Sequence, residues 1–365
     1  MVASGENNVP TSFSARVSWD IVRWWVIGLY AVVLVAFCAT WGVPMDRVGL
    51  TLWIIAGLSA ACIGKGLRAW GRMMLDWLPF QGILLAYDYS YGAASHFTGG
   101  LIGGFPQEGA HNSVGMPLHV TFPVDVDKWL FGGTLPNQWV QEHLSGAVQQ
   151  APWWSVFITL CYISHFMVSP IVAAVLWVKK RTMFRAWAAL LVALAVAGIA
   201  TYFLFPMSPP WLASQQGYID GPEVLRISGQ GWAWLDFRGA AQVLGDAQNR
   251  SNPVAAMPSL HMATSTLVVG FFWFNSRRWV RPLLLLYPAL MAFTLVYSGE
   301  HYVVDEIAGV FYALVLLAAW RVLHRRPLHL PRKLGGQGVL ASWKVADGET
   351  LLDPTDRPVD VVQHG

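Results

Sequence analysis

Long runs of apolar residues, almost free of charge, are the feature that most restricts what this chain can fold into. A membrane-spanning helix needs about 20 consecutive apolar residues. Hydrophobic residues make up 55% of the 365 residues and charged residues only 12%, about half the charged share of an ordinary soluble domain. The sequence therefore predicts an all-α, polytopic membrane protein with about eight transmembrane helices. The runs lie at 22–42, 47–64, 73–89, 152–178, 184–205, 259–275, 281–298 and 301–323.

The run at 73–89 is the weakest candidate for a span, because Asp76 and Pro79 interrupt it. The positions of basic residues decide the case, since cytoplasmic loops are enriched in Lys and Arg. The basic clusters within 65–72 and 179–185 fall on one side of the membrane only if 73–89 crosses it. We therefore count this run as a span. The alternative, a re-entrant or interfacial helix, conflicts with the remaining basic clusters.

This topology predicts a protein of the cell membrane. Both termini lie in the cytoplasm, and the loops 90–151 and 206–258 lie outside. The tail 324–365 is rich in Gly, Pro and charge, so we expect it to be flexible. The formal net charge of +3 is too small, and its basic residues too dispersed, for a nucleic-acid surface. The three cysteines lie in apolar runs and match no metal-ligand spacing. We expect neither a nucleic-acid partner nor a metal site.

Two histidines stand at the ends of apolar runs that this topology places outside. His261, in "MPSLHMATST", lies at the start of the sixth run, and His301, in "GEHYVVDE", begins the eighth. Asp305 follows His301 at a spacing of i, i+4, so on a helix both side chains share one face and the carboxylate can accept the imidazole N–H. That hydrogen bond fixes the tautomer and leaves the other ring nitrogen able to attack an electrophile.

The residues around His261 are typical of a phosphate-binding helix start. Pro258 favours the first helical position, and the backbone N–H groups of Ser259 and Leu260 are expected at the positive end of the helix dipole. The Ser259 hydroxyl adds a donor, and protonated His261 can deliver a proton to a leaving oxygen. Together these residues predict a phosphoryl-transfer site. The alternative is structural, because a single histidine near a helix end is more often packed or interfacial than catalytic.

The two histidine motifs carry a resemblance to a known family. "PSLH" at 258–261 and "HYVVD" at 301–305 resemble the second and third signatures of the type 2 phosphatidic acid phosphatase (PAP2) superfamily. Leu260 and the stretches "LFGGTLP" and "FPMSPPW" are similar to the branch that contains inositol phosphorylceramide synthase and related actinobacterial membrane proteins. The resemblance extends over much of the chain, but it is specific at the histidine motifs.

This resemblance implies a separate catalytic role for each of three residues. His301 would be the nucleophile that forms a phosphohistidine, Asp305 would orient it, and His261 would protonate the leaving group. The resemblance also implies a six-helix catalytic core within 68–323, with the cytoplasmic N-terminus and two additional transmembrane helices in 1–67. It implies no metal and no cofactor.

Three cations that the family's signatures supply for the phosphate are missing. "FPMSPPW" stands where the first signature carries Lys and Arg-Pro, and the residues just before His301 lack the arginine of the third signature. The phosphate-binding cation must then come from a loop. The loops offer Lys128, Arg226, Arg238 and Arg250. Arg250, next to the helix start, is the first choice and Arg238 the second, although either is equally well explained as a solvated loop charge.

Further polar residues are candidates for a substrate pocket. His165, inside the fourth run, is either a pocket residue or a buried histidine bonded to nearby backbone. Tyr87 and Asp88 either grip a polyol head group or belong to the interfacial belt of the membrane. Glu300 either binds a hydroxylated head group or caps a helix. Lys128 completes the candidate set as a loop cation.

These residues predict a membrane lipid phosphotransferase. It would move a phosphoryl or phospho-head group, such as phosphoinositol, from a phospholipid or polyprenyl phosphate donor to a lipid or hydroxyl acceptor. If water is the acceptor, the enzyme is a lipid phosphate phosphatase instead. A different class of explanation is a non-catalytic transporter or scaffold of the same fold, in which the membrane histidines serve as proton relays or packing residues.

Overall fold

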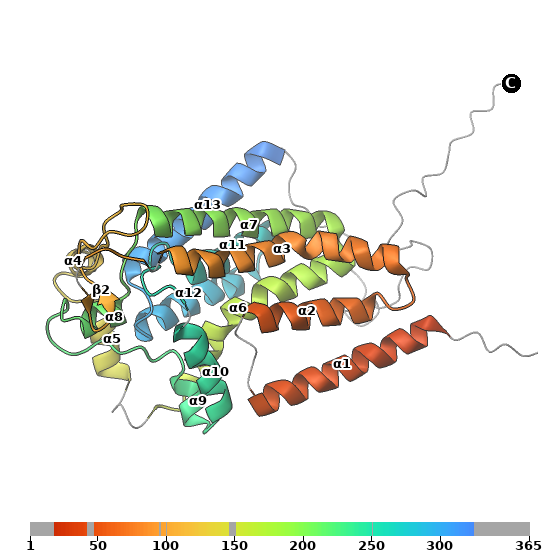
Figure 1. The fold of residues 1–365 in the computed structure, drawn as a ribbon, viewed down its shortest axis with the longest axis horizontal. Coiled ribbons are helices and arrows are strands. Elements are labelled where there is room, and N and C mark those ends of the chain that lie inside the picture. Colours follow the sequence, from red (N-terminus) through yellow and green to blue (C-terminus); the bar gives the residue numbers. More distant parts are fainter. Residues whose placement is uncertain are drawn as a thin grey trace, which may run out of the picture.

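The computed structural model describes residues 18–41, 47–94, 96–99, 101–145, 151–249 and 251–324. Within them, eight long apolar helices form a bundle (Figure 1). Each coincides with one of the runs expected from the sequence, so the all-α polytopic fold is confirmed. The helices are α1 (Trp19–Trp41), α2 (Arg47–Ala61), α3 (Leu67–Ala94), α6 (Ser155–Lys179), α7 (Arg181–Leu204), α11 (Leu260–Phe272), α12 (Arg281–Tyr297) and α13 (Val303–His324).

The length and composition of these helices suit a multi-pass membrane protein. Over the described ranges, α1, α6, α7 and α13 are long and apolar enough to cross a membrane, whereas α2, α11 and α12 are apolar but shorter. α3 is the longest helix but carries Asp76 within its apolar sequence. The Asp76 carboxylate forms an ion pair with Arg181 Nη2 at 2.9 Å and accepts a hydrogen bond from Trp177 Nε1 at 2.9 Å. A charge inside an apolar bundle needs such partners.

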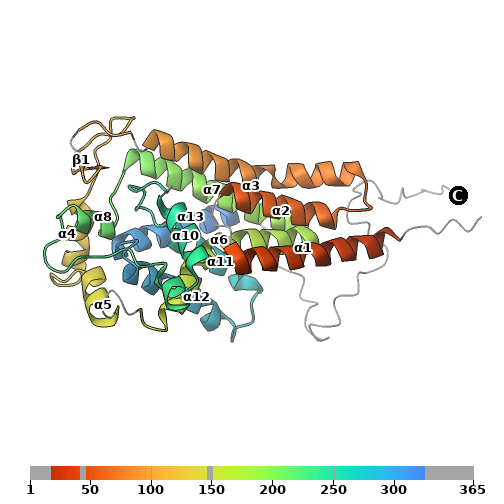
Figure 2. The same cartoon turned by 60° about the horizontal axis from the view of Figure 1, so that its bottom comes forward.

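Shorter elements gather at one end of the bundle (Figures 1 and 2). We call the group of α4, α5, α8 and a small hairpin the cap. It comprises α4 (Thr121–Leu130), α5 (Pro136–Leu144), α8 (Pro210–Gln215), and β1 (Leu101–Ile102) paired antiparallel with β2 (Phe105–Pro106). The other short helices are α9 (Gln230–Trp234) and α10 (Arg238–Asn249), which pack beside α6 and α1, and η1 (Trp273–Asn275), which extends α11.

Backbone hydrogen bonds join the two long loops into one unit. The Met207 N–H donates to the Val254 carbonyl at 2.9 Å, and the His119 N–H donates to the Pro206 carbonyl at 3.0 Å. Beneath these hydrogen-bonded loop segments, buried apolar side chains of both loops pack around Tyr302, which is fully buried. The cap therefore contacts both the segment that leads into α11 and the residue that follows His301.

Large side chains fill the interior of the bundle. Trp77 of α3, Trp187 of α7 and Phe271 of α11 are buried in one hydrophobic cluster. Full burial of such a side chain stabilises a fold by about 1.5–3 kcal/mol or more. The cluster holds α3, α6, α7, α11 and α13 together below the cap.

Glycines allow α11 and α13 to approach closely. A Cβ added to Gly309 of α13 would lie 2.4 Å from the Ser259 carbonyl oxygen, and one added to Gly270 of α11 would lie 2.1 Å from Leu317 Cδ1. Only glycine leaves room for such a contact. The start of α11, which carries His261, and the start of α13, which follows His301, are thus set side by side.

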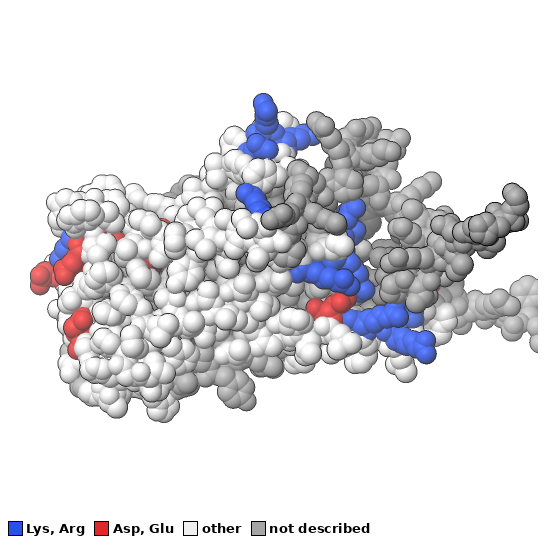
Figure 3. Space-filling model, turned by 90° about the horizontal axis from the view of Figure 1, so that it is seen from above, with Lys and Arg blue, Asp and Glu red and all other residues white. Residues whose placement is uncertain are grey.

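Charged residues are segregated along the bundle. On the face seen in Figure 3, Lys and Arg gather at the end opposite the cap, and most of the acidic residues lie at the cap end. The basic end includes the junctions between α2 and α3, between α6 and α7, and before α12. This arrangement agrees with the sidedness expected from the sequence. Which end faces the cytoplasm stays a prediction, as do the boundaries 1–67, 68–323 and 324–365.

Candidate active site

A cavity of about 590 Å³ lies where the starts of α11 and α13 meet the sides of α2, α3, α6 and α7. Its volume is within the range of ~300–1,000 Å³ that is usual for ligand sites. The polar part of the wall includes Arg226, Gln248, Ser251, Asn252, His165, His261, Glu300 and His301. The apolar part includes Leu50, Ile54, Phe80, Ile83, Phe166, Leu191 and Leu194. Such a cavity suits a ligand with a polar head and an apolar tail.

His301 and Asp305 lie together as the sequence predicts. His301 Nδ1 is 3.3 Å from Asp305 Oδ2, which also accepts the Tyr302 N–H at 3.0 Å. Asp305 is fully buried and His301 is only 6% exposed. When Nδ1 donates to the carboxylate, the lone pair is on Nε2. His301 is in the cavity wall, so this nitrogen is the candidate nucleophile.

A carboxylate from the cap fixes the start of α13. Asp127 of α4 accepts hydrogen bonds from the N–H groups of Val303 and Val304, at 2.8 and 3.0 Å. These are among the N–H groups that a helix cannot satisfy internally. Burial raises the pKa of Asp127 to about 6, although the two N–H groups oppose the rise. Asp127 therefore holds the turn that carries Asp305, a role that the sequence alone does not reveal.

The turn before His301 is fixed from α5. Asn137 Nδ2 donates to the carbonyl oxygens of Val296 and His301, at 2.8 and 3.0 Å, and Asn137 is fully buried. Within the turn, Gly299 has φ +71°, and a Cβ on it would lie 2.5 Å from the Leu225 carbonyl oxygen. Glycine is required at such a position. The backbone on either side of His301 is thus held by contacts from distant parts of the chain.

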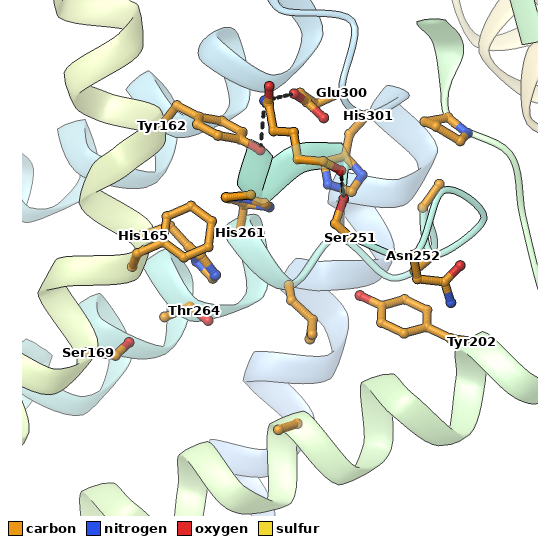
Figure 4. Close-up of a pocket in the computed structure, with 18 of the residues that line it drawn as sticks. Tyr162, His165, Ser169, Tyr202, Ser251, Asn252, His261, Thr264, Glu300 and His301 are labelled. Carbon is orange, nitrogen blue, oxygen red and sulfur yellow. Dashed lines mark hydrogen bonds between the residues drawn. The ribbon is translucent and has the colours of Figure 1, made fainter. Parts of the chain in front are cut away.

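His261 faces His301 across the polar part of the cavity (Figure 4). Their ring centroids are 5.7 Å apart. On its other sides the His261 ring stacks on Tyr162 at 4.9 Å and lies 4.1 Å from the ring of His165. His261 Nε2 is buried and has no hydrogen-bond partner among the described residues. A polar group of a ligand would satisfy it.

The start of α11 differs in detail from the expectation. The helix begins at Leu260, and Ser259 is the N-cap, its Oγ accepting the Met262 N–H at 3.3 Å. Ser259 is fully buried and is not part of the cavity wall. Its hydroxyl oxygen therefore caps the helix. Leu260 does line the cavity, and its side chain packs against Gly198 of α7. The Ser259 N–H donates to the Asp305 carbonyl oxygen at 3.1 Å. Anion binding at this helix start stays a prediction that rests on the backbone N–H of Leu260.

Among the residues that the structure describes, one arginine lies in the cavity wall, and it is paired. Arg226 Nε and Nη2 donate to the two carboxylate oxygens of Glu300, at 2.9 and 3.0 Å. Glu300 Oε1 also accepts hydrogen bonds from Ser228 Oγ at 2.7 Å and from Gln248 Nε2 at 2.8 Å. The guanidinium lies over the ring of Trp211, with Cζ 4.9 Å from the centroid. Burial lowers the pKa of Arg226, but the Glu300 carboxylate more than offsets this effect, so the pKa is raised and the side chain stays charged.

The structure does not bring Arg238 or Lys128 to the cavity wall. Arg238 is exposed and pairs with Asp236 at 2.9 Å, and Lys128 lies half-buried on α4, outside the cavity wall. Arg250 lies outside the described residues. The sequence favours Arg250 and Arg238 over Arg226 because they lie closer along the chain to the motif that contains His261. The signal that favours Arg226 was Glu300, because an acid beside a phosphate site needs a basic partner.

The remaining pocket candidates have different outcomes. His165 of α6 lines the cavity beside His261, and Glu300 lines it beside His301 (Figure 4). Tyr87 and Asp88 belong to α3, but their side chains lie outside the described part of the chain. Over the residues that the structure describes, no group of three or more His, Cys, Asp or Glu side chains could hold a metal ion.

The arrangement suits displacement at phosphorus. The imidazole of His301, in the turn before α13, and the imidazole of His261, in the first turn of α11, line the same cavity with their ring centroids 5.7 Å apart. Arg226 provides a positive charge at the same end of the cavity. Preorganised groups of this kind stabilise charge that develops in a transition state.

Comparison with known proteins agrees with the sequence resemblance. A family model described as the PAP2 superfamily matches residues 135–319, which extend from α5 to α13. A protein of Bacteroides thetaiotaomicron named phosphoinositol dihydroceramide synthase is 26% identical over 206 residues, a match covering 54% of this chain and 66% of the relative. The chain thus spans just under two thirds of that relative. No solved structure gives a significant match.

Proposed function

This chain belongs to the PAP2 superfamily, and we propose that it is an enzyme that transfers a phospho-head group between membrane lipids. The donor is a phospholipid with a phosphodiester head, of the phosphoinositol kind, and the acceptor is a lipid hydroxyl. The observation that carries the proposal is the His301–Asp305 pair facing His261 in a cavity with a polar end and apolar walls. The name of the relative, phosphoinositol dihydroceramide synthase, supports the choice of head group.

The first step is attack by His301 Nε2 on the donor phosphorus. A nitrogen–phosphorus bond forms while the bond from phosphorus to the diacylglycerol oxygen breaks, and His261 gives its proton to that oxygen. Asp305 accepts the Nδ1 proton of His301 in a hydrogen bond and stabilises the positive charge that develops on the ring. Diacylglycerol leaves, and the head group remains on His301.

The second step reverses these roles. The acceptor hydroxyl attacks phosphorus, His261 takes its proton, and the nitrogen–phosphorus bond breaks. Water as the acceptor would give a phosphatase, so transfer requires that the acceptor exclude water. The apolar walls from α2, α3, α6 and α7 support this requirement, because they can receive lipid chains from within the membrane.

We also infer the orientation of the enzyme. The basic end of the bundle lies opposite the cap (Figure 3), which favours a cytoplasmic basic end and a reaction at the outer face. Both termini would then be cytoplasmic. The catalytic core would lie within 68–323, with α1 and α2 as an addition.

Product analysis tests the proposal. The purified protein is incubated with phosphate-labelled phosphatidylinositol, phosphatidate or polyprenyl phosphate, each with and without a ceramide or diacylglycerol acceptor. The expected result is a new labelled lipid that forms from phosphatidylinositol and requires the lipid acceptor. Release of water-soluble label at the same rate without acceptor would identify a hydrolase instead. Absence of turnover with every donor would favour the transporter or scaffold.

A further inference from the structure

The carboxylate of Glu300 is the most heavily hydrogen-bonded acid in the cavity wall. It receives two hydrogen bonds from Arg226, one from Ser228 and one from Gln248, all between 2.7 and 3.0 Å. Glu300 is only 7% exposed. Its oxygens are therefore already satisfied by protein donors, and a hydroxyl of a ligand is not needed to pair it. The direct polyol contact expected for Glu300 is less well supported than a role through Arg226.

The pairing changes the charge that a ligand meets. Among the described residues of the cavity wall, Arg226 is the one arginine and Glu300 the one glutamate, and their charges cancel. When His261 is protonated, it contributes a single positive charge. A phosphodiester carries one negative charge, whereas a phosphomonoester carries about 1.5 to 2 at pH 7. In a poorly solvated site, the second charge of a monoester would lack a partner, which is costly.

We propose that Glu300 is a specificity-determining residue that neutralises and positions Arg226, and so makes the site selective for phosphodiester lipids over phosphomonoester lipids. The proposal rests on the proposed function, because it concerns the head-group end of the same cavity. Arg226 holds the phosphate oxygens from a fixed position over Trp211. Glu300 sets how much positive charge is left for the ligand.

The surrounding contacts support a built pair rather than a chance surface bridge. The Trp211 N–H donates to the Gly299 carbonyl at 3.2 Å, which ties the start of α8 to the turn that carries Glu300. Trp211 comes from the "FPMSPPW" stretch, so the segment that lacks the usual signature cations supplies the aromatic surface for Arg226. Exposed ion pairs contribute little, but a bidentate, mostly buried arginine–carboxylate pair is strongly oriented.

The test compares binding of two lipids that differ only in the head group. Dioctanoyl phosphatidate and dioctanoyl phosphatidylinositol are titrated into detergent-solubilised full-length protein, and dissociation constants are measured by calorimetry. All variants carry His301→Ala, so that neither lipid is consumed. Glu300→Gln keeps the size of the side chain but frees the charge of Arg226. Asp236→Asn is the matched control, because it breaks the exposed pair with Arg238 and leaves the cavity intact.

Glu300→Gln should raise the affinity for phosphatidate relative to phosphatidylinositol by about tenfold or more, and Asp236→Asn should leave the ratio unchanged. Arg226→Gln should lower affinity for both lipids, and for phosphatidate more. A ratio within twofold of the parent in Glu300→Gln, an equal change in the control, or no binding of either lipid to the parent would overturn the proposal. The ratio is read without turnover. A shift in the ratio combined with no head-group transfer by the protein that retains His301 would therefore refute the proposed function alone.

Discussion

Gly309 of α13 lies against the backbone of Ser259 of α11, so closely that a Cβ on Gly309 would sit 2.4 Å from the Ser259 carbonyl oxygen. Ser259 caps the helix that carries His261, and Gly309 is one turn beyond Asp305 on the other. The Ser259 N–H also donates to the Asp305 carbonyl at 3.1 Å. The separation of His261 and His301 therefore depends on this glycine.

Gly309→Ala should separate the two helices and lower transfer activity. Forcing a methyl group into a close contact costs about 1–3 kcal/mol of stability, and a displacement of 1 Å between reacting groups can cost about 100-fold in rate. The measurement is kcat together with the unfolding temperature in detergent. Gly71→Ala is the control, because a Cβ at Gly71 of α3 meets no atom within 4 Å. Full activity of Gly309→Ala would contradict the inferred role of the contact.

Asp127 should make stability depend on pH in a definite direction. Its pKa is about 6 in the folded protein, raised by burial from an ordinary value of 3.8, so between these values the folded state keeps a proton that the unfolded state has lost. The free energy of unfolding must then fall as pH rises through this window, by at most about 3 kcal/mol, and level off above it.

Asp127→Asn removes that titration while keeping an acceptor for one N–H group of α13. The difference in unfolding temperature, wild type minus variant, should decrease from pH 4 to pH 6.5 and then stay constant. Thermal unfolding at a series of pH values measures it. A difference that grows with pH would show that the buried carboxylate is stabilised in its charged form, with Asp305 nearby having little influence.

The apolar part of the cavity should set the preference for lipid chains. Ala195 of α7 lines the cavity, and Ala195→Phe places a ring in the space assigned to a lipid tail. For a long-chain donor, kcat/KM should fall about tenfold, as expected for a loss near 1.4 kcal/mol of binding, whereas a short-chain donor should be affected less. Ala193→Phe, on the same helix but outside the cavity wall, is the control. Equal losses for both chain lengths would place the tail elsewhere.

The sequence predicts the helices and the pairing of His301 with Asp305 because both depend on local information. Apolar runs specify α1, α2 and the rest of the bundle by composition alone. His301 and Asp305 are four residues apart, although His301 lies in the turn before α13 and only Asp305 lies on the helix. The family model, which matches residues 135–319, confirms the resemblance that these motifs indicate. The roles of His301, Asp305 and His261 stay predictions until they are measured.

Other parts of the site depend on contacts between distant segments. Asp127 and Asn137 form hydrogen bonds with backbone groups of α13 and of the turn before it. The residues next to them in the sequence do not indicate these contacts. Arg226 reaches Glu300 through the fold of the second loop. Proximity along the chain favoured Arg250 and Arg238, but Arg238 points to solvent with Asp236. Long-range pairing with Glu300, rather than spacing along the chain, places Arg226 in the cavity wall.

The most direct measurement of the central claim is the identity of the residue that carries the transferred group. Purified protein is mixed with phosphatidylinositol labelled at phosphorus, quenched before turnover is complete, and digested for mass spectrometry. The label should reside on the peptide that contains His301, as an acid-labile, alkali-stable adduct. His301→Ala should lose the adduct and at least about 10³-fold in kcat, and His143→Ala, on the exposed face of α5, should keep both. Label retained in His301→Ala, or transfer at the full rate without it, would contradict the phosphohistidine mechanism.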